Sequence, residues 1–236
     1  MKRKALTIAL LIGLPLVGIA ASSLTTYFVV KKKDQERLNE IYKLAFEAHY
    51  NDRVSLFKEE NKHATNVDVV FLGDSLTEGY NVKEYYSEYS VLNRGIGGDT
   101  TFGVEKRLKE SVYDANPKIT TMLIGANNFD SMLDNYENIL IDFKQKAPEM
   151  KVILLSLTSM TGNWGRNNDK AKKNNVEIEK YATKYGYSYV NLYDPLLDPS
   201  TNELKLDYTT DGGHLTDAGY QVVTAQIKPV IQSLLA

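Results

Sequence analysis

The sequence contains no cysteine and only three histidines among its 236 residues. The absence of cysteine excludes a disulfide framework, a thiolate-bound metal centre, an iron–sulfur cluster and a cysteine nucleophile. His214 is the one histidine beyond residue 63, so histidine-based chemistry in the rest of the chain depends on it. His49 and His63 have no carboxylate or histidine at metal-ligand spacing, and we interpret both as surface residues.

The charged residues are unevenly distributed. Residues 1–33 hold six of the 28 Lys and Arg and no acid, so the remainder carries 22 basic residues against all 30 Asp and Glu, a net charge of −8. A net negative charge of this size argues against binding to the phosphate backbone of a nucleic acid. Apolar residues make up 43% and charged residues 25%, as is typical of a globular domain.

The N-terminal segment predicts an interaction with a membrane. Residues 5–30 carry no charge and lie between basic residues at 2–4 and 31–33. As a helix, such a run would extend about 39 Å, enough to cross a bilayer. Two interpretations stay open: an uncleaved single-pass anchor, or a signal peptide cleaved near the small residues 18–23. Both place the remainder outside the cytoplasm, either at the cell membrane or secreted.

Two further regions follow this segment. Residues 34–63 contain neither glycine nor proline, and their apolar residues recur at helical spacing. We therefore expect an anchor or signal segment at 1–33, a helical linker at 34–63 and one domain at 64–236.

Beyond residue 64, short apolar runs alternate with helix-like segments. The runs lie at 67–72, 91–93, 119–124, 151–157 and 187–192, and the expected helices at 101–114, 134–147, 169–185 and 216–234. This alternation predicts an α/β fold with a parallel sheet covered on both faces. Ligands of such sheets bind at the carboxyl ends of the strands, so we expect chemistry in the loops that follow the runs.

Several of these loops carry residues that together suit acyl transfer. Ser75 follows the first run, although a serine there is often only a helix N-cap. Asp211 precedes His214 by three residues across two glycines, so its carboxylate could orient an imidazole base. Gly98 and Asn127 could donate hydrogen bonds to an oxyanion, although both residue types also favour turns.

The same residues resemble a known family. The four motif blocks of the SGNH, or GDSL-type, hydrolases are matched over about residues 67–235 by Gly73-Asp-Ser-Leu76, Gly98, Asn127 and Asp211-x-x-His214. Residues 93–100 and 125–128 are most similar to the branch typified by the catalytic subunits of platelet-activating-factor acetylhydrolase.

The resemblance implies a three-layer α/β/α, flavodoxin-like fold and esterase or lipase chemistry without a metal or other cofactor. Carried over by position, Ser75 is the nucleophile, His214 the general base and Asp211 the residue that orients it. The backbone N–H groups of Ser75 and Gly98, with the Asn127 side chain, form the oxyanion hole.

The resulting hypothesis is an extracytoplasmic serine esterase of lysophospholipids, other acyl lipids or O-acetylated sugars. Two alternatives stay open: an acyltransferase on cell-surface glycans, and a non-catalytic binding module at the cell surface. The expected partners are a small-molecule, lipid or glycan ester and, through the N-terminal helix, the membrane. Trp164, the single tryptophan, either contacts the substrate or closes the core.

Overall fold

The computed structural model describes the backbone of residues 2–236 and the side chains of residues 27–236. The chain divides into two compact units, Met1–Ala48 and His49–Ala236, and helix α1 (Lys2–Asn61) runs through the first into the second. Most of the predicted anchor or signal segment, 1–33, lies outside the described side chains, which begin at residue 27. Among the residues that were described, no helix is both long and apolar enough to cross a bilayer.

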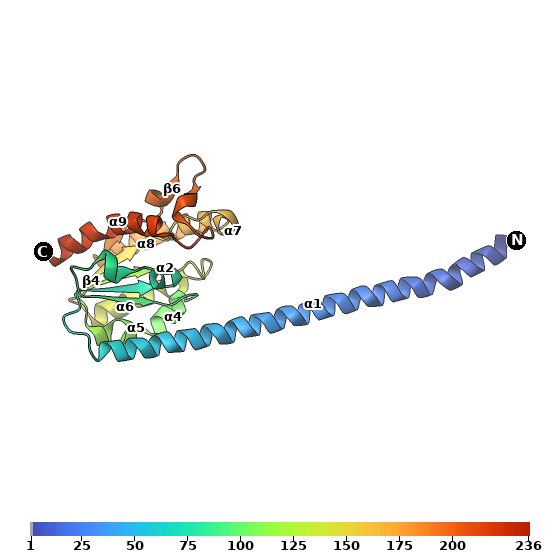
Figure 1. Cartoon of the computed structure of the whole chain (residues 1–236), viewed down its shortest axis with the longest axis horizontal. Coiled ribbons are helices and arrows are strands. Elements are labelled where there is room, and N and C mark those ends of the chain that lie inside the picture. The colour runs from blue at the N-terminus through green and yellow to red at the C-terminus, as the bar shows by residue number, and fades with distance from the viewer. Residues whose placement is uncertain (1) are drawn as a thin grey trace. The chain divides into compact units, whose positions relative to one another are not determined.

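The second unit is built on a five-stranded parallel sheet (Figure 1). Its strands lie side by side in the order β2-β1-β3-β4-β5, and every neighbouring pair is parallel. Their bounds are β1 Val69–Gly73, β2 Val91–Gly95, β3 Ile119–Leu123, β4 Lys151–Leu155 and β5 Ser188–Val190. The α/β class and the parallel sheet predicted from the sequence are therefore confirmed.

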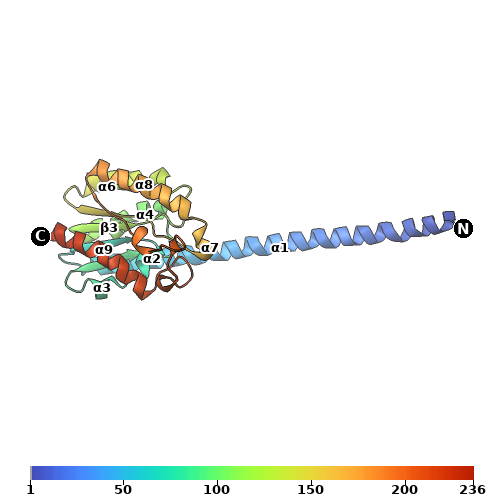
Figure 2. The ribbon, with the colours of Figure 1, turned by 90° about the horizontal axis from the view of Figure 1, so that it is seen from above.

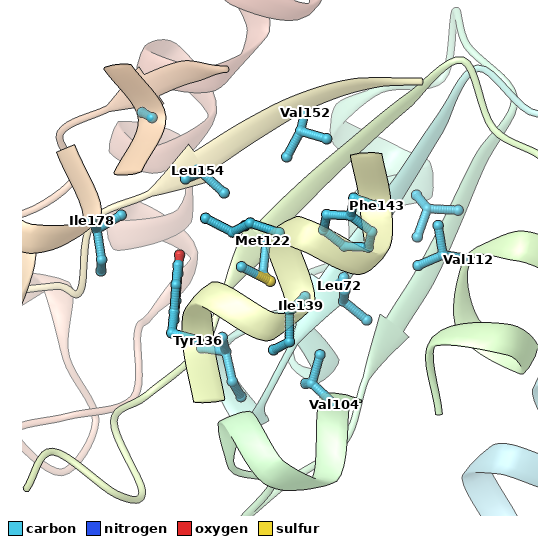
Figure 3. Close-up of a cluster of buried hydrophobic side chains, with 14 of the residues drawn as sticks. Leu72, Val104, Val112, Met122, Tyr136, Ile139, Phe143, Val152, Leu154 and Ile178 are labelled. Carbon is cyan, nitrogen blue, oxygen red and sulfur yellow. The ribbon is translucent and has the colours of Figure 1, made fainter. Parts of the chain in front are cut away.

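Helices cover both faces of this sheet because successive strand residues point to opposite sides. In β1, Val70 and Leu72 join one apolar cluster, whereas Val69 and Phe71 join the other. The first cluster lies under four helices, and Figure 3 shows its packing. These helices are α4 (Thr101–Lys106), α5 (Leu108–Ser111), α6 (Leu133–Lys146) and α8 (Asn168–Tyr185). The second lies under α9 (Asp217–Leu235), which crosses the opposite face, while α6 and α8 run side by side (Figure 2).

One expected helix is interrupted. Residues 101–114 form α4 (Thr101–Lys106), α5 (Leu108–Ser111) and a 3-10 turn, Tyr113–Ala115. Arg107 lies between α4 and α5 with φ −111° and ψ 14°, outside the helical region. Its side chain is buried and hydrogen-bonds to Asp99 and to the Gly73 carbonyl oxygen. These tertiary contacts explain why the helix is interrupted at Arg107.

Short elements connect the larger ones. They are α2 (Ser75–Glu78), α3 (Val82–Tyr85), α7 (Gly162–Gly165), the 3-10 turns Asp194–Leu196 and Leu206–Tyr208, and the two-residue strands β6 (Leu197–Asp198) and β7 (Glu203–Leu204). Helix α2 begins two residues after β1 ends, and α7 lies in the longer connection that follows β4, so both belong to segments that leave the carboxyl ends of strands, where the sequence places the candidate site.

The C-terminal turns of α1 pack on the sheet unit. Phe57 is fully buried, and Asn61 donates to the Glu110 carbonyl oxygen at 2.7 Å. The buried guanidinium of Arg94 pairs with Glu60 and donates to Asn61 Oδ1. The compact unit consequently begins at His49, within the segment expected as a linker, because these contacts join the end of the helix to β2 and α5.

Candidate active site

Ser75 is placed by a tight connection between β1 and α2. Gly73 ends the strand, and a Cβ there would lie 2.2 Å from Thr77 Oγ1 and 2.3 Å from the Leu123 carbonyl oxygen, so only glycine fits. Asp74 caps the helix by accepting from the Leu76 N–H at 3.1 Å. Ser75 is therefore the first helical residue, and Asp74 fills the capping role that the sequence left open for serine.

The Asp211–His214 turn is organised by its own carboxylate. Asp211 Oδ1 accepts the backbone N–H groups of Gly213 and His214, at 2.9 and 2.8 Å, while Oδ2 lies 2.7 Å from His214 Nδ1. Gly212 has φ +95°, a region that side chains rarely adopt. One carboxylate thus shapes the turn and orients the imidazole.

The structure brings this turn to Ser75. His214 Nε2 lies 2.9 Å from Ser75 Oγ, although 139 residues separate them in the sequence. Partial burial opposes ionisation of Asp211, but the N–H groups and ring of His214 and the N–H of Gly213 outweigh it and lower the pKa of Asp211 to about 2. The carboxylate is therefore charged at neutral pH and can stabilise an imidazolium.

The loop after β4 supports the turn from the outside. Thr161 N donates to the Gly212 carbonyl oxygen at 2.8 Å. Trp164 packs on Gly213, where a Cβ would lie 3.1 Å from the indole, and its ring meets the His214 ring edge-on at 6.1 Å. Trp164 also packs partly against the core. The sequence left open whether Trp164 contacts the substrate or closes the core. Its ring packs partly against the core and also lies next to His214, the candidate base.

The second strand end supplies the predicted oxyanion turn. Asp99 N donates to the Ile96 carbonyl oxygen at 3.1 Å, and Gly98 has φ +79°. A Cβ on Gly97 would lie 3.9 Å from Ser75 Cβ, so the turn is next to the serine. Asn127 Nδ2 donates to the Asp99 carbonyl oxygen at 2.8 Å, which ties the third strand end to the same turn.

Two buried arginines behind this turn were missed by the sequence analysis. Arg107 pairs with Asp99 at 2.8 Å and donates to the carbonyl oxygens of Arg94 and Gly73, both at 2.9 Å. Burial raises the pKa of Asp99, although Arg107 opposes the rise. Because Gly73 ends β1 and Arg94 lies in β2, the Arg107 guanidinium hydrogen-bonds to both strand ends. The sequence offered one sign of buried arginines here, because Arg94 directly follows an apolar run predicted to be a buried strand.

His49 is exposed, as expected. The structure adds a contact that the sequence did not predict, since His49 Nε2 lies 3.0 Å from Glu78 Oε2. The two residues are 29 positions apart and on different helices, so no spacing rule could have paired them. His63 is exposed, as expected.

Asp74 differs from the carboxylates above because it is fully buried. Burial raises its pKa to about 7, and its Oδ2 has no hydrogen-bond partner in the part of the chain that was described. Within that same part, no three Asp, Glu or His side chains gather in a way that could hold a metal ion. The ionised acid next to the imidazole is Asp211, and the arrangement of serine, imidazole and carboxylate suits nucleophilic acyl transfer.

Known proteins resemble this chain in sequence. The model of the GDSL-like Lipase/Acylhydrolase family matches residues 71–222, well over half of the chain. Human platelet-activating factor acetylhydrolase IB subunit alpha2 is 28% identical over 183 residues, which cover 71% of this chain and 77% of the relative.

Solved structures have the same fold. A Streptococcus pneumonia protein named for platelet activating factor aligns with a TM-score of 0.75 and 24% identity, over 81% of this chain and 97% of its own. A GDSL-like lipase from Bacteroides thetaiotaomicron aligns with a TM-score of 0.68 and 27% identity, over 76% of this chain and 97% of its own.

Proposed function

Because this chain belongs to the GDSL-like lipase/acylhydrolase family, we propose that it hydrolyses carboxylic esters through an acyl-enzyme on Ser75. The observation that carries the proposal is the unbroken contact series from Asp211 through His214 to Ser75 Oγ, at 2.7 and 2.9 Å. A hydroxyl is a weak nucleophile until an adjacent base takes its proton, and this series supplies that base.

The chemistry follows from the geometry. His214 Nε2 accepts the Ser75 proton as Oγ attacks the ester carbonyl, and Asp211 stabilises the imidazolium. The negatively charged oxygen of the tetrahedral intermediate accepts hydrogen bonds from the N–H groups of Ser75 and Gly98 and from the amide of Asn127. His214 then protonates the departing alcohol, and water repeats the same steps on the acyl-enzyme to release the acid.

A short acyl group on a lipid or sugar alcohol is the proposed substrate class. The human relative is named an acetylhydrolase, which supports a small acyl group. The Trp164 ring lies beside His214, with the two ring centroids 6.1 Å apart, and such an aromatic ring could pack against a bulky alcohol or an acyl chain.

The proposed location is extracytoplasmic, with the N-terminal segment as a membrane anchor or a cleaved signal. The uncharged residues 5–30 between basic flanks support it. Fractionation and protease treatment of intact cells would test it: an exported protein is digested from outside and an internal one is protected. The N-terminal sequence of the mature protein separates anchor from cleaved signal.

The experiment that tests the function is hydrolysis of p-nitrophenyl esters, from acetyl to palmitoyl, by the full chain and by Ser75→Ala. Loss of the serine is expected to lower kcat by roughly 10⁴–10⁶-fold, with the highest rates in the wild type on acetyl and butyryl esters. Equal rates in both proteins, or none in either, would refute the esterase proposal and favour a transferase or a binding module.

A further inference from the structure

A cluster of three ionisable side chains lies at the end of α2, the short helix that begins with Ser75. Glu78 ends α2, and two residues of α1 contact its carboxylate: His49 Nε2 is 3.0 Å from Oε2, and Arg53 Nε is 3.4 Å from Oε1. The backbone N–H of Gly97 donates to the same Oε2 at 2.5 Å. The cluster therefore binds the residue that directly precedes Gly98, the predicted oxyanion donor.

Arg53 also holds the beginning of the same loop. Its Nε and Nη2 donate to the Gly95 carbonyl oxygen at 3.2 and 3.0 Å. The guanidinium lies over the Phe57 ring, 5.0 Å from its centroid, and Phe57 is buried beneath Arg94. Arg53 is thus fixed by stacking and by hydrogen bonds. It binds the loop before Ile96, at Gly95, while its partner Glu78 binds the loop after Ile96, at Gly97.

The loop held in this way contains a peptide that can point in two directions. Residues 96–99 form a turn with a positive φ at its third position, Gly98, which is the mark of type II. Types I and II differ in the orientation of the central peptide, here Gly97–Gly98, and a change of type would turn the Gly98 N–H away from its present direction. Two adjacent glycines offer no Cβ to resist that change.

We propose that Glu78 is a positioning residue for ester hydrolysis: by accepting the Gly97 N–H it anchors the Ile96–Gly97 peptide at the start of the turn, and so holds the turn in the place from which the Gly98 N–H can reach the oxyanion that forms on a Ser75-bound ester. His49 and Arg53 hold the Glu78 carboxylate in place. The positive charge of Arg53 also offsets the carboxylate charge, which would otherwise oppose the nearby oxyanion. This inference rests on the proposed function and adds α1, which lies outside the family match, to the catalytic apparatus.

Kinetics of full-chain variants test the proposal on p-nitrophenyl acetate. Glu78→Ala is expected to lower kcat roughly 10- to 100-fold, less than the 10²–10³-fold typical for a donor that is removed altogether. KM is expected to change less than about twofold, because the donor acts mainly in the transition state. Glu78→Gln keeps an oxygen that can accept the Gly97 N–H, so it is expected to recover most of kcat.

His49→Ala and Arg53→Ala are expected to lower kcat in the same direction by smaller factors. They test the proposal independently if Glu78→Ala fails to fold. The matched controls are His63→Ala and Glu47→Ala, two exposed residues outside the site, which are expected to behave as wild type.

The outcomes separate this proposal from the esterase proposal. If the wild type shows no turnover that depends on Ser75, both proposals are wrong. If it does, and Glu78→Ala and Arg53→Ala keep wild-type kcat, only the positioning role is refuted. An equal loss in Glu78→Ala and Glu78→Gln, or a rise in KM alone, also refutes it.

Discussion

The carboxylate of Asp99 and the guanidinium of Arg107 form a buried ion pair, with Nε 2.8 Å from Oδ2, directly behind the turn that contains Gly98. Both side chains are almost completely shielded from water. The same guanidinium binds the ends of β1 and β2 through two carbonyl oxygens. This pair therefore sets the distance between the strand end that carries Ser75 and the one that carries the oxyanion turn.

Removing one partner of this pair should be costly. Arg107→Met leaves the Asp99 carboxylate buried without a counter-charge, and we expect the free energy of unfolding to fall by about 3–5 kcal/mol. Urea titration of the full chain measures it, with Lys106→Met as the exposed neighbouring control. A loss below about 1 kcal/mol, the size of an ordinary surface effect, would contradict the assigned role.

The Asp211–His214 contact predicts a loss of rate without a loss of fold. In Asp211→Asn, the amide oxygen can still accept the N–H groups of Gly213 and His214, but it no longer stabilises the imidazolium, and the wrong ring tautomer is favoured. We expect kcat to fall by roughly 10⁴-fold, with little change in melting temperature. Steady-state kinetics beside Asp207→Asn, an exposed acid nearby, checks this. Wild-type kcat in Asp211→Asn would exclude the assigned orientation of His214.

Asp74 predicts a pH dependence of stability. Burial raises its pKa from 3.8 to about 7 in the folded protein. Between these values the folded state keeps a proton that the unfolded chain releases, so the contribution of Asp74 to stability falls as pH rises from about 4 to about 7. Asp74→Asn is neutral throughout. We therefore expect its unfolding free energy, relative to wild type, to increase over this range, as measured by urea unfolding. A constant difference from pH 4 to 8 would show that Asp74 is ionised in the fold.

Two glycines with positive φ form a matched pair. A Cβ at Gly212 (φ +95°) would lie 2.5 Å from the Thr161 carbonyl oxygen, whereas one at Gly162 (φ +56°) meets nothing within 4 Å. Gly162→Ala should cost only about 1 kcal/mol of stability from backbone strain. Gly212→Ala should also displace the Asp211 turn and lower kcat by roughly 10²-fold, since misplacement by about 1 Å has that effect. Equal kinetics in the two variants would refute this difference.

The features that follow from local sequence patterns were predictable. Five apolar runs alternated with helices, so the sheet and the edge that carries Ser75 followed from local patterns. The Asp211–His214 turn was also predictable, because the contact between its side chains spans three residues. Its meeting with Ser75 required the fold or a family resemblance.

The contacts between distant segments were not predictable. Arg107 interrupts an expected helix because its side chain binds strand ends that local propensity does not describe. His49 and Glu78 belong to separate helices, and each is an ordinary surface residue in its own sequence context. Pairing of this kind depends on tertiary packing alone.

The packing of Phe57 and Glu60 determines which truncations and chimeras of this protein are expected to fold. The family match begins at residue 71, but Arg94 relies on Glu60, Asn61 and the Phe57 ring, all upstream of it. A chimera that inherits only the matched residues would carry a guanidinium without its counter-charge and a hydrophobic surface open to water. The smallest fragment expected to fold by itself therefore begins at His49, where the compact unit starts.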